Sequence, residues 1–313
     1  MRICSLLLCT TFLVSSITSS YAEISTHKLI RQDNSELIYY LDKQAEHNKT
    51  LLVLMQGSDC NSIKNNTFIQ ETFGRWLPSS DVLMVEKYGI TAQLTYSDDN
   101  GEREDCPKNY KLHDNPNQRL ADYLAVLDKL SPNYTNIVLL GGSEGATMVH
   151  LVVAERHDIS AAIALNGGGR FFLDDVLYNI RNTTPKKHVE EAINSFQQLA
   201  NAIITNQIDD EQFVSEHSKL WWQQYLAIDL LEVIKRNTQT PVLIVQTLDD
   251  INVDVAAFHQ LSQEITQPNV TFIKYDKLNH GFYNQQGERL TGKSFKIYSN
   301  GMRNIINNLF ILS

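Results

Sequence analysis

The sequence has few cysteines, no excess of positive charge and no apolar run long enough to cross a membrane. Lys and Arg total 27 against 36 Asp and Glu, so the net charge is −9, which argues against partners such as nucleic acid or anionic lipid. The apolar segment from Ser5 to Val14 has only about half of the roughly 20 residues that a bilayer requires. We therefore expect no stable membrane insertion, and the composition leaves the oligomeric state open.

The first 22 residues have the pattern of a secretory signal peptide. Arg2 provides the positive start, the segment from Ser5 to Val14 the apolar core, and Ser20-Tyr-Ala22 a cleavage site of small residues. We expect a periplasmic or secreted protein whose single α/β domain spans residues 23–313.

Cysteine is scarce, with 4 in the chain and only Cys60 and Cys106 beyond the signal segment. They form no CxxC or Cys/His spacing typical of metal binding, and no metal or organic cofactor is indicated. In an oxidising compartment two such thiols predict one disulfide, with two unpaired cysteines as the alternative.

Strand and helix patterns alternate along the chain, which predicts an α/β fold with a mostly parallel sheet and helices on both faces. The expected strands are residues 35–41, 50–55, 81–88, 136–140, 159–165, 241–246 and 270–275. The expected helices between and after them are residues 118–130, 144–157, 253–265 and 300–312, and residues 89–116 read as irregular.

Residues 170–240 interrupt this alternation, because they contain no convincing strand. Helical patterns cover 189–205 and 212–235 instead. We interpret the segment as a helical cap inserted over the sheet and not as a second domain.

The pentapeptide Gly141-Gly-Ser143-Glu-Gly145 fits the G-x-S-x-G motif between a predicted strand and a predicted helix. In that context the serine projects from a sharp turn at the top of the sheet and serves as a nucleophile. The alternative is a serine that only caps the helix.

A serine nucleophile requires a base to take its proton and an acid to orient that base. Asp249 and Asp250 follow the strand at 241–246, and we favour Asp250, because the turn brings it back over the sheet edge. His259 and His280 are the histidines that follow the acid. We favour His280, which lies in a loop after the last strand, over His259, which lies in a helical pattern.

The negative charge that develops on the substrate requires two backbone N–H donors. The N–H of Glu144 follows the nucleophile directly, and the loop Gln56-Gly-Ser58 after the strand at 50–55 offers the N–H of Ser58. A disulfide at Cys60 would hold that loop in shape. The alternative is an ordinary Gly-Ser turn.

With these motifs in this order, the chain resembles the α/β-hydrolase superfamily from about residue 35 to 312. It is most similar to the serine aminopeptidase, prolyl-oligopeptidase-like and lysophospholipase-like groups, in which a helical cap separates the elbow from the acid and the histidine. Two residues depart from the usual pattern: Gln56 replaces a common histidine, and Thr247 replaces a common glycine.

The expected cap carries five aromatic residues that could line a substrate pocket: Phe171, Phe172, Trp221, Trp222 and Tyr225. Packing of the cap is the alternative role for each. The sequence therefore predicts an exported serine hydrolase for a small-molecule ester, with a short peptide or amide as the second choice of substrate. A non-catalytic binding module on the same fold is the alternative of another class.

Overall fold

The computed structural model describes residues 24–290 apart from 46, 78–79, 99–102 and 211. The expected signal peptide at 1–22 and the expected helix at 300–312 lie outside this range. No helix within the described range combines the length and the apolar character needed to span a bilayer.

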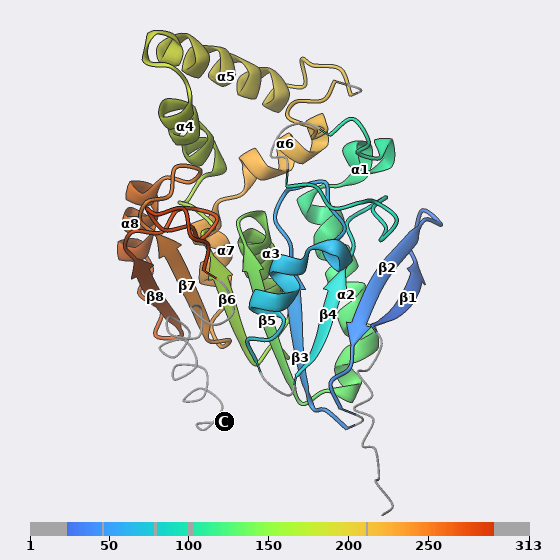
Figure 1. Cartoon of the computed structure of the whole chain (residues 1–313). Coiled ribbons are helices and arrows are strands. Elements are labelled where there is room, and N and C mark those ends of the chain that lie inside the picture. The colour runs from blue at the N-terminus through green and yellow to red at the C-terminus, as the bar shows by residue number, and fades with distance from the viewer. Residues whose placement is uncertain (1–23, 46, 78–79, 99–102, 211, 291–313) are drawn as a thin grey trace, which may run out of the picture.

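Eight strands form one sheet in the order β1-β2-β4-β3-β5-β6-β7-β8 (Figure 1). The strands are β1 (Ser25–Ile30), β2 (Glu36–Asp42), β3 (Thr50–Met55), β4 (Asp81–Val85), β5 (Asn136–Gly142), β6 (Ala161–Leu165), β7 (Val242–Thr247) and β8 (Val270–Tyr275). Strand β2 pairs antiparallel with β1 and β4, and all the other neighbours pair in parallel. The predicted α/β fold with a mostly parallel sheet is thus confirmed.

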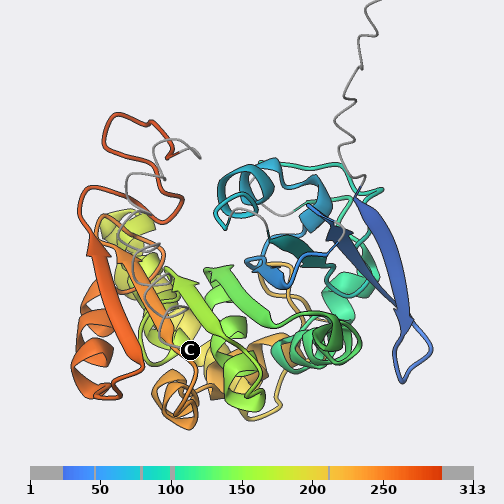
Figure 2. The ribbon, with the colours of Figure 1, turned by 90° about the horizontal axis from the view of Figure 1, so that it is seen from below.

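The α-helices are α1 (Lys108–His113), α2 (Pro116–Leu130), α3 (Glu144–Glu155), α4 (Phe172–Thr183), α5 (Val189–Ile204), α6 (Lys219–Ala227), α7 (Leu230–Arg236) and α8 (Val255–Glu264). Helices α2, α3, α7 and α8 cover one face of the sheet, and the short helices η1 (Ile63–Asn65) and η2 (Ile69–Phe73) lie on the other (Figure 2). Strand β3 shows why both faces are apolar: Leu51 and Val53 join the core cluster beneath α2 and α3, while Leu52 and Leu54 join the opposite one.

Helices α4 to α7 lie between β6 and β7 in the sequence, and α4, α5 and α6 stand above the carboxyl ends of the strands (Figure 1). The pattern at 212–235 is two short helices and not one, and α7 packs into the core against the sheet. Helix α4 and the short helix α1, inside the stretch expected to be irregular, were not expected from the sequence.

Candidate active site

Ser143 lies at the sharp turn between β5 and α3, with φ 56° and ψ −125°. A positive φ is uncommon for a residue with a side chain, and such strain is concentrated at functional sites. The Ser143 N–H donates to the carbonyl of Leu165 on the adjacent strand at 2.9 Å, which holds the turn against β6. The side chain is half-buried at the carboxyl edge of the sheet.

The two outer glycines of the motif allow this turn to form. A Cβ on Gly145 would lie 2.1 Å from the carbonyl oxygen of Met55, and a Cβ on Gly141 would lie 2.2 Å from the carbonyl oxygen of Gly145. Real Cβ contacts are much longer, so only glycine permits α3 to approach β3 and β5 this closely.

The structure brings Asp250 and His280 together from loops that follow β7 and β8. His280 Nδ1 lies 2.8 Å from Asp250 Oδ2, and the Asp250 side chain is fully buried, while that of His280 is 19% exposed. The other carboxylate oxygen, Asp250 Oδ1, accepts the N–H groups of Asn252 at 2.8 Å and Val253 at 3.2 Å. These two hydrogen bonds fix the carboxylate in a position from which it can orient the imidazole.

The two alternative residues lie elsewhere. Asp249 is exposed, and its carboxylate accepts from the Gln285 side chain at 3.2 Å. His259 is exposed on α8, where Nδ1 lies 2.7 Å from Lys274 Nζ. Neither of them contacts the pair formed by Asp250 and His280 in any interaction that the structure shows.

Asn166, directly after β6, holds the histidine loop and was not identified from the sequence. Its Nδ2 donates to the His280 carbonyl at 3.0 Å, and its Oδ1 accepts from the N–H and the hydroxyl of Thr247 at 2.9 and 3.1 Å. The residue is buried with φ 51°, a conformation that asparagine tolerates better than most residues. Thr247, where relatives often have glycine, therefore contributes a hydroxyl to this link.

The turn after β3 lies beside Ser143. A Cβ on Gly57 would be 3.5 Å from Ser143 Cβ and 4.0 Å from Ser143 Oγ. The Gln56 side chain braces the turn, because its Nε2 donates to the carbonyl of Asn61 at 2.9 Å and to the carboxylate of Asp59. Ser58, one of the two residues predicted to provide an oxyanion donor, is exposed in this turn. Glu144, the other predicted oxyanion donor, begins α3 directly after Ser143.

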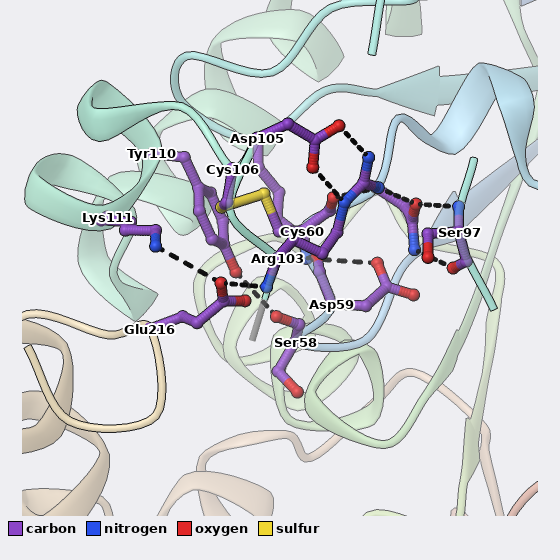
Figure 3. The surroundings of a disulfide bond; sticks show 12 residues. Ser58, Asp59, Cys60, Ser97, Arg103, Asp105, Cys106, Tyr110, Lys111 and Glu216 are labelled. Atoms are coloured by element: carbon purple, nitrogen blue, oxygen red, sulfur yellow. Dashed lines mark hydrogen bonds and ion pairs between the residues drawn. A yellow bond between two sulfur atoms is a disulfide. The ribbon is translucent and has the colours of Figure 1, made fainter. Parts of the chain in front are cut away.

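The predicted disulfide between Cys60 and Cys106 is present, with a Cα–Cα distance of 6.0 Å (Figure 3). Arg103 reinforces it, since its guanidinium donates to the Cys60 carbonyl at 3.0 Å. The Arg103 N–H donates to Glu216 Oε1 at 2.7 Å, and Lys111 Nζ lies 3.4 Å from the same oxygen. The disulfide segment thus connects the turn after β3 with the loop that precedes α6.

Helix α4 contacts the loop that carries Asp250. The Tyr178 hydroxyl donates to the Asp250 carbonyl at 3.1 Å, and Asp175 accepts the Asp254 N–H at 2.7 Å. Asp175 also accepts the N–H of Gly169, and burial raises the pKa of its carboxyl to about 7. The cap and the acid loop are therefore joined by hydrogen bonds from two residues of one helix.

The five cap aromatics differ in exposure. Trp221, Trp222 and Tyr225 are buried at 3–5% exposure, and the Phe172 ring lies 5.3–5.8 Å from all three rings. Phe171 is 40% exposed. Four of these residues thus form the interior of the cap, and a role of the five in lining a substrate pocket stays a prediction.

No group of three or more His, Cys, Asp or Glu side chains suited to a metal ion occurs among residues 24–290 as far as they are described.

A protein-family model described as BAAT / acyl-CoA thioester hydrolase C terminal matches residues 121–283, more than half of the chain. No match was found among curated protein sequences.

Many solved structures share the fold. Est1E from Butyrivibrio proteoclasticus has a TM-score of 0.55 at 18% identity, with 91% of this chain and 99% of that chain covered. The Pyrococcus furiosus esterase Pf2001 has a TM-score of 0.56 at 12% identity, with 92% and 89% covered. An α/β hydrolase from Novosphingobium aromaticivorans has a TM-score of 0.52 at 16% identity, with 83% and 92% covered.

Proposed function

The chain belongs to the family of BAAT / acyl-CoA thioester hydrolase C-terminal domains and has the α/β-hydrolase fold, and on this basis we propose that it is a serine hydrolase of carboxylic esters. The observation that carries the proposal is the 2.8 Å approach of His280 Nδ1 to the buried carboxylate of Asp250, on the same sheet edge as the strained Ser143. Three groups with these roles are what acyl transfer to a serine requires.

In the proposed reaction, Ser143 Oγ attacks the acyl carbon while His280 Nε2 takes its proton. Asp250 accepts the Nδ1–H of the same ring, which keeps Nε2 free to act as the base. The N–H groups of Ser58 and Glu144 stabilise the oxyanion of the tetrahedral intermediate. His280 then protonates the leaving group, and water activated by His280 releases the acid from Ser143.

An oxygen ester is the first choice of substrate, and a thioester is the second, favoured by the family description. The structural neighbour Pf2001, which is named as an esterase, supports the first choice, and Est1E has been solved with a carboxylic acid, ferulic acid, bound. Amide or peptide cleavage is the remaining alternative, and a non-catalytic binding module is the alternative of another class.

We also propose that the protein is exported. The charge and apolar pattern of residues 1–22 supports export, and so does the disulfide between Cys60 and Cys106, because such bonds persist in oxidising compartments.

A matched panel of substrates with one acyl group tests the reaction class. The acyl chain, varied from short to long, is presented as an aryl ester, as a coenzyme A thioester and as an anilide, and Ser143→Ala is the control. We expect kcat/KM to be highest for an ester and to be lost in Ser143→Ala. Faster cleavage of the anilide would favour the amidase alternative, and no Ser143-dependent turnover of any member would favour the binding module.

A further inference from the structure

A buried ion pair involves the residue next to the proposed nucleophile, because Glu144 directly follows Ser143 in the chain. Arg119 on α2 donates to Glu144 Oε1 at 2.7 Å, and the two side chains are only 3% and 4% exposed. Removing both charges from water is expensive, and apolar residues of similar size often stabilise a core as well or better. A buried pair at this position therefore indicates a role beyond stability.

The second nitrogen of the same guanidinium reaches the turn after β3. Arg119 Nη2 donates to the Gln56 carbonyl at 2.7 Å, while Nη1 binds Glu144. Glu144 carries one of the two proposed oxyanion donors on its own N–H. The Gln56 carbonyl lies two residues before Ser58, which carries the other. One planar group thus contacts both halves of the proposed oxyanion hole.

The peptide groups around Ser58 are anchored on both sides. A peptide is planar, so fixing its carbonyl also fixes the direction of its N–H. Arg119 fixes the peptide between Gln56 and Gly57. The Tyr110 hydroxyl donates to the Ser58 carbonyl at 2.7 Å and fixes the peptide between Ser58 and Asp59. The peptide between them is the one that carries the Ser58 N–H.

Arg119 itself is held on a rigid element. Helix α2 begins with Pro116 after Asn115, whose side chain accepts the N–H of Gln118 at 3.0 Å. An N-cap hydrogen bond of this kind fixes the first turn of a helix, and Arg119 lies in that turn. A guanidinium fork also makes two directed hydrogen bonds that a lysine ammonium on a flexible stem does not reproduce.

We infer that Arg119 is a positioning residue that holds the N–H donors of Ser58 and Glu144 in register with each other. The inference rests on the proposed function, because the register matters only if an oxyanion forms at Ser143. Misplacing a donor should weaken binding of the transition state and leave binding of the substrate nearly unchanged.

The chain offers a matched control in a second buried ion pair that involves the same helix. Arg31 binds Asp122 of α2 through two contacts of 2.8 Å, and these side chains are 6% and 5% exposed. Arg31→Lys and Arg119→Lys therefore make the same chemical change in ion pairs of similar burial. Neither Arg31 nor Asp122 contacts the turn after β3 or the elbow in any hydrogen bond that the structure shows.

The test compares kcat, KM, the unfolding midpoint and the affinity for a boronic acid that forms a tetrahedral adduct. Complete loss of one oxyanion donor costs about 10²- to 10³-fold in kcat, so Arg119→Lys, which displaces donors, should cost about 10- to 100-fold. We expect KM to change by less than about threefold and the boronate affinity to fall in proportion to kcat/KM. Arg31→Lys should keep kcat within about twofold, although its unfolding midpoint should fall about as much as that of Arg119→Lys.

Glu144→Gln provides a milder second variant, because the amide oxygen still accepts from Arg119 but without the charge. It should lower kcat and boronate affinity together, by about 3- to 10-fold, and it carries the test if Arg119→Lys does not fold. The inference is overturned if both variants keep kcat within twofold, or if kcat falls while boronate affinity does not. Turnover of the natural chain that persists in Ser143→Ala would instead overturn the proposed function and the inference with it.

Discussion

Replacing Asp250 by asparagine should disable the proposed base while leaving the loop nearly intact. In the natural chain, Asp250 Oδ1 accepts the backbone N–H groups of Asn252 and Val253. The other oxygen, Oδ2, lies 2.8 Å from His280 Nδ1 and 3.0 Å from Gln246 Nε2. The asparagine amide has a single oxygen, and two backbone donors keep it in the Oδ1 position.

The new NH₂ group must then occupy the position of Oδ2. It faces the donor of Gln246 and donates to His280 Nδ1, so the proton of the imidazole is forced onto Nε2. A protonated Nε2 cannot accept the proton of Ser143. The wrong tautomer cost about 10⁴-fold in kcat in a well-studied triad, which corresponds to about 5 kcal/mol of barrier.

Steady-state kinetics on the best ester of the panel measures this effect, with circular dichroism to show that the fold is retained. Asp249→Asn is the matched control, because its exposed side chain accepts from Gln285 and the amide oxygen can still do so. We expect the control to stay within about twofold. The reasoning would be refuted if Asp250→Asn kept more than a tenth of kcat, or if Asp249→Asn lost as much of its kcat as Asp250→Asn.

Other changes act on separate parts of the molecule. Reduction of the bond between Cys60 and Cys106, which are 46 positions apart, should lower the free energy of unfolding by roughly 4 kcal/mol and should also lower turnover. The Cys60→Ser/Cys106→Ser variant can be assayed at 25 °C, which is below the temperature of about 45 °C where such domains begin to unfold. If this folded variant keeps full kcat, the bond contributes to stability alone. Burial lowers the pKa of His150 to about 4, so the unfolded chain binds a proton first as pH falls below about 6.5. Between pH 7.5 and pH 5, the free energy of unfolding measured in urea should fall by about 2 kcal/mol more for the natural chain than for His150→Gln. An equal decrease in both chains would contradict this. Gly145→Ala places a Cβ 2.1 Å from the Met55 carbonyl and should sharply lower the unfolding midpoint; an unchanged midpoint would show that the elbow relaxes.

Features that depend on local pattern could be predicted from the sequence. Strand β3 is a continuous apolar run between polar residues, and the elbow lies between such a strand and a helix. Strand β1 was missed, because its residues alternate between half-buried and exposed at the edge of the sheet, and STHKLI has little apolar character. Helix α4 was missed although Phe172, Val176 and Ile180 recur at helical spacing, so the sequence did carry a signal for it.

Contacts between distant segments could not be predicted in this way. The sequence indicated Glu144 for its N–H, but its ion pair with Arg119 joins residues 25 positions apart. Asn166 and His280 are 114 positions apart, and only the order of β6, β7 and β8 in the sheet brings them together. Asparagine at the end of a buried strand, followed by three glycines, was the available signal for Asn166.

Covalent labelling by a fluorophosphonate, followed by intact-mass measurement and peptide mapping, tests the central claim most directly. The reagent reacts with serines that a neighbouring base has activated, and the adduct reports the nucleophile without reference to any substrate. The account predicts a single adduct on Ser143 of the folded chain, its absence in Ser143→Ala and a strong decrease in His280→Ala. Robust labelling of Ser143→Ala, or no labelling of the folded natural chain, would contradict it.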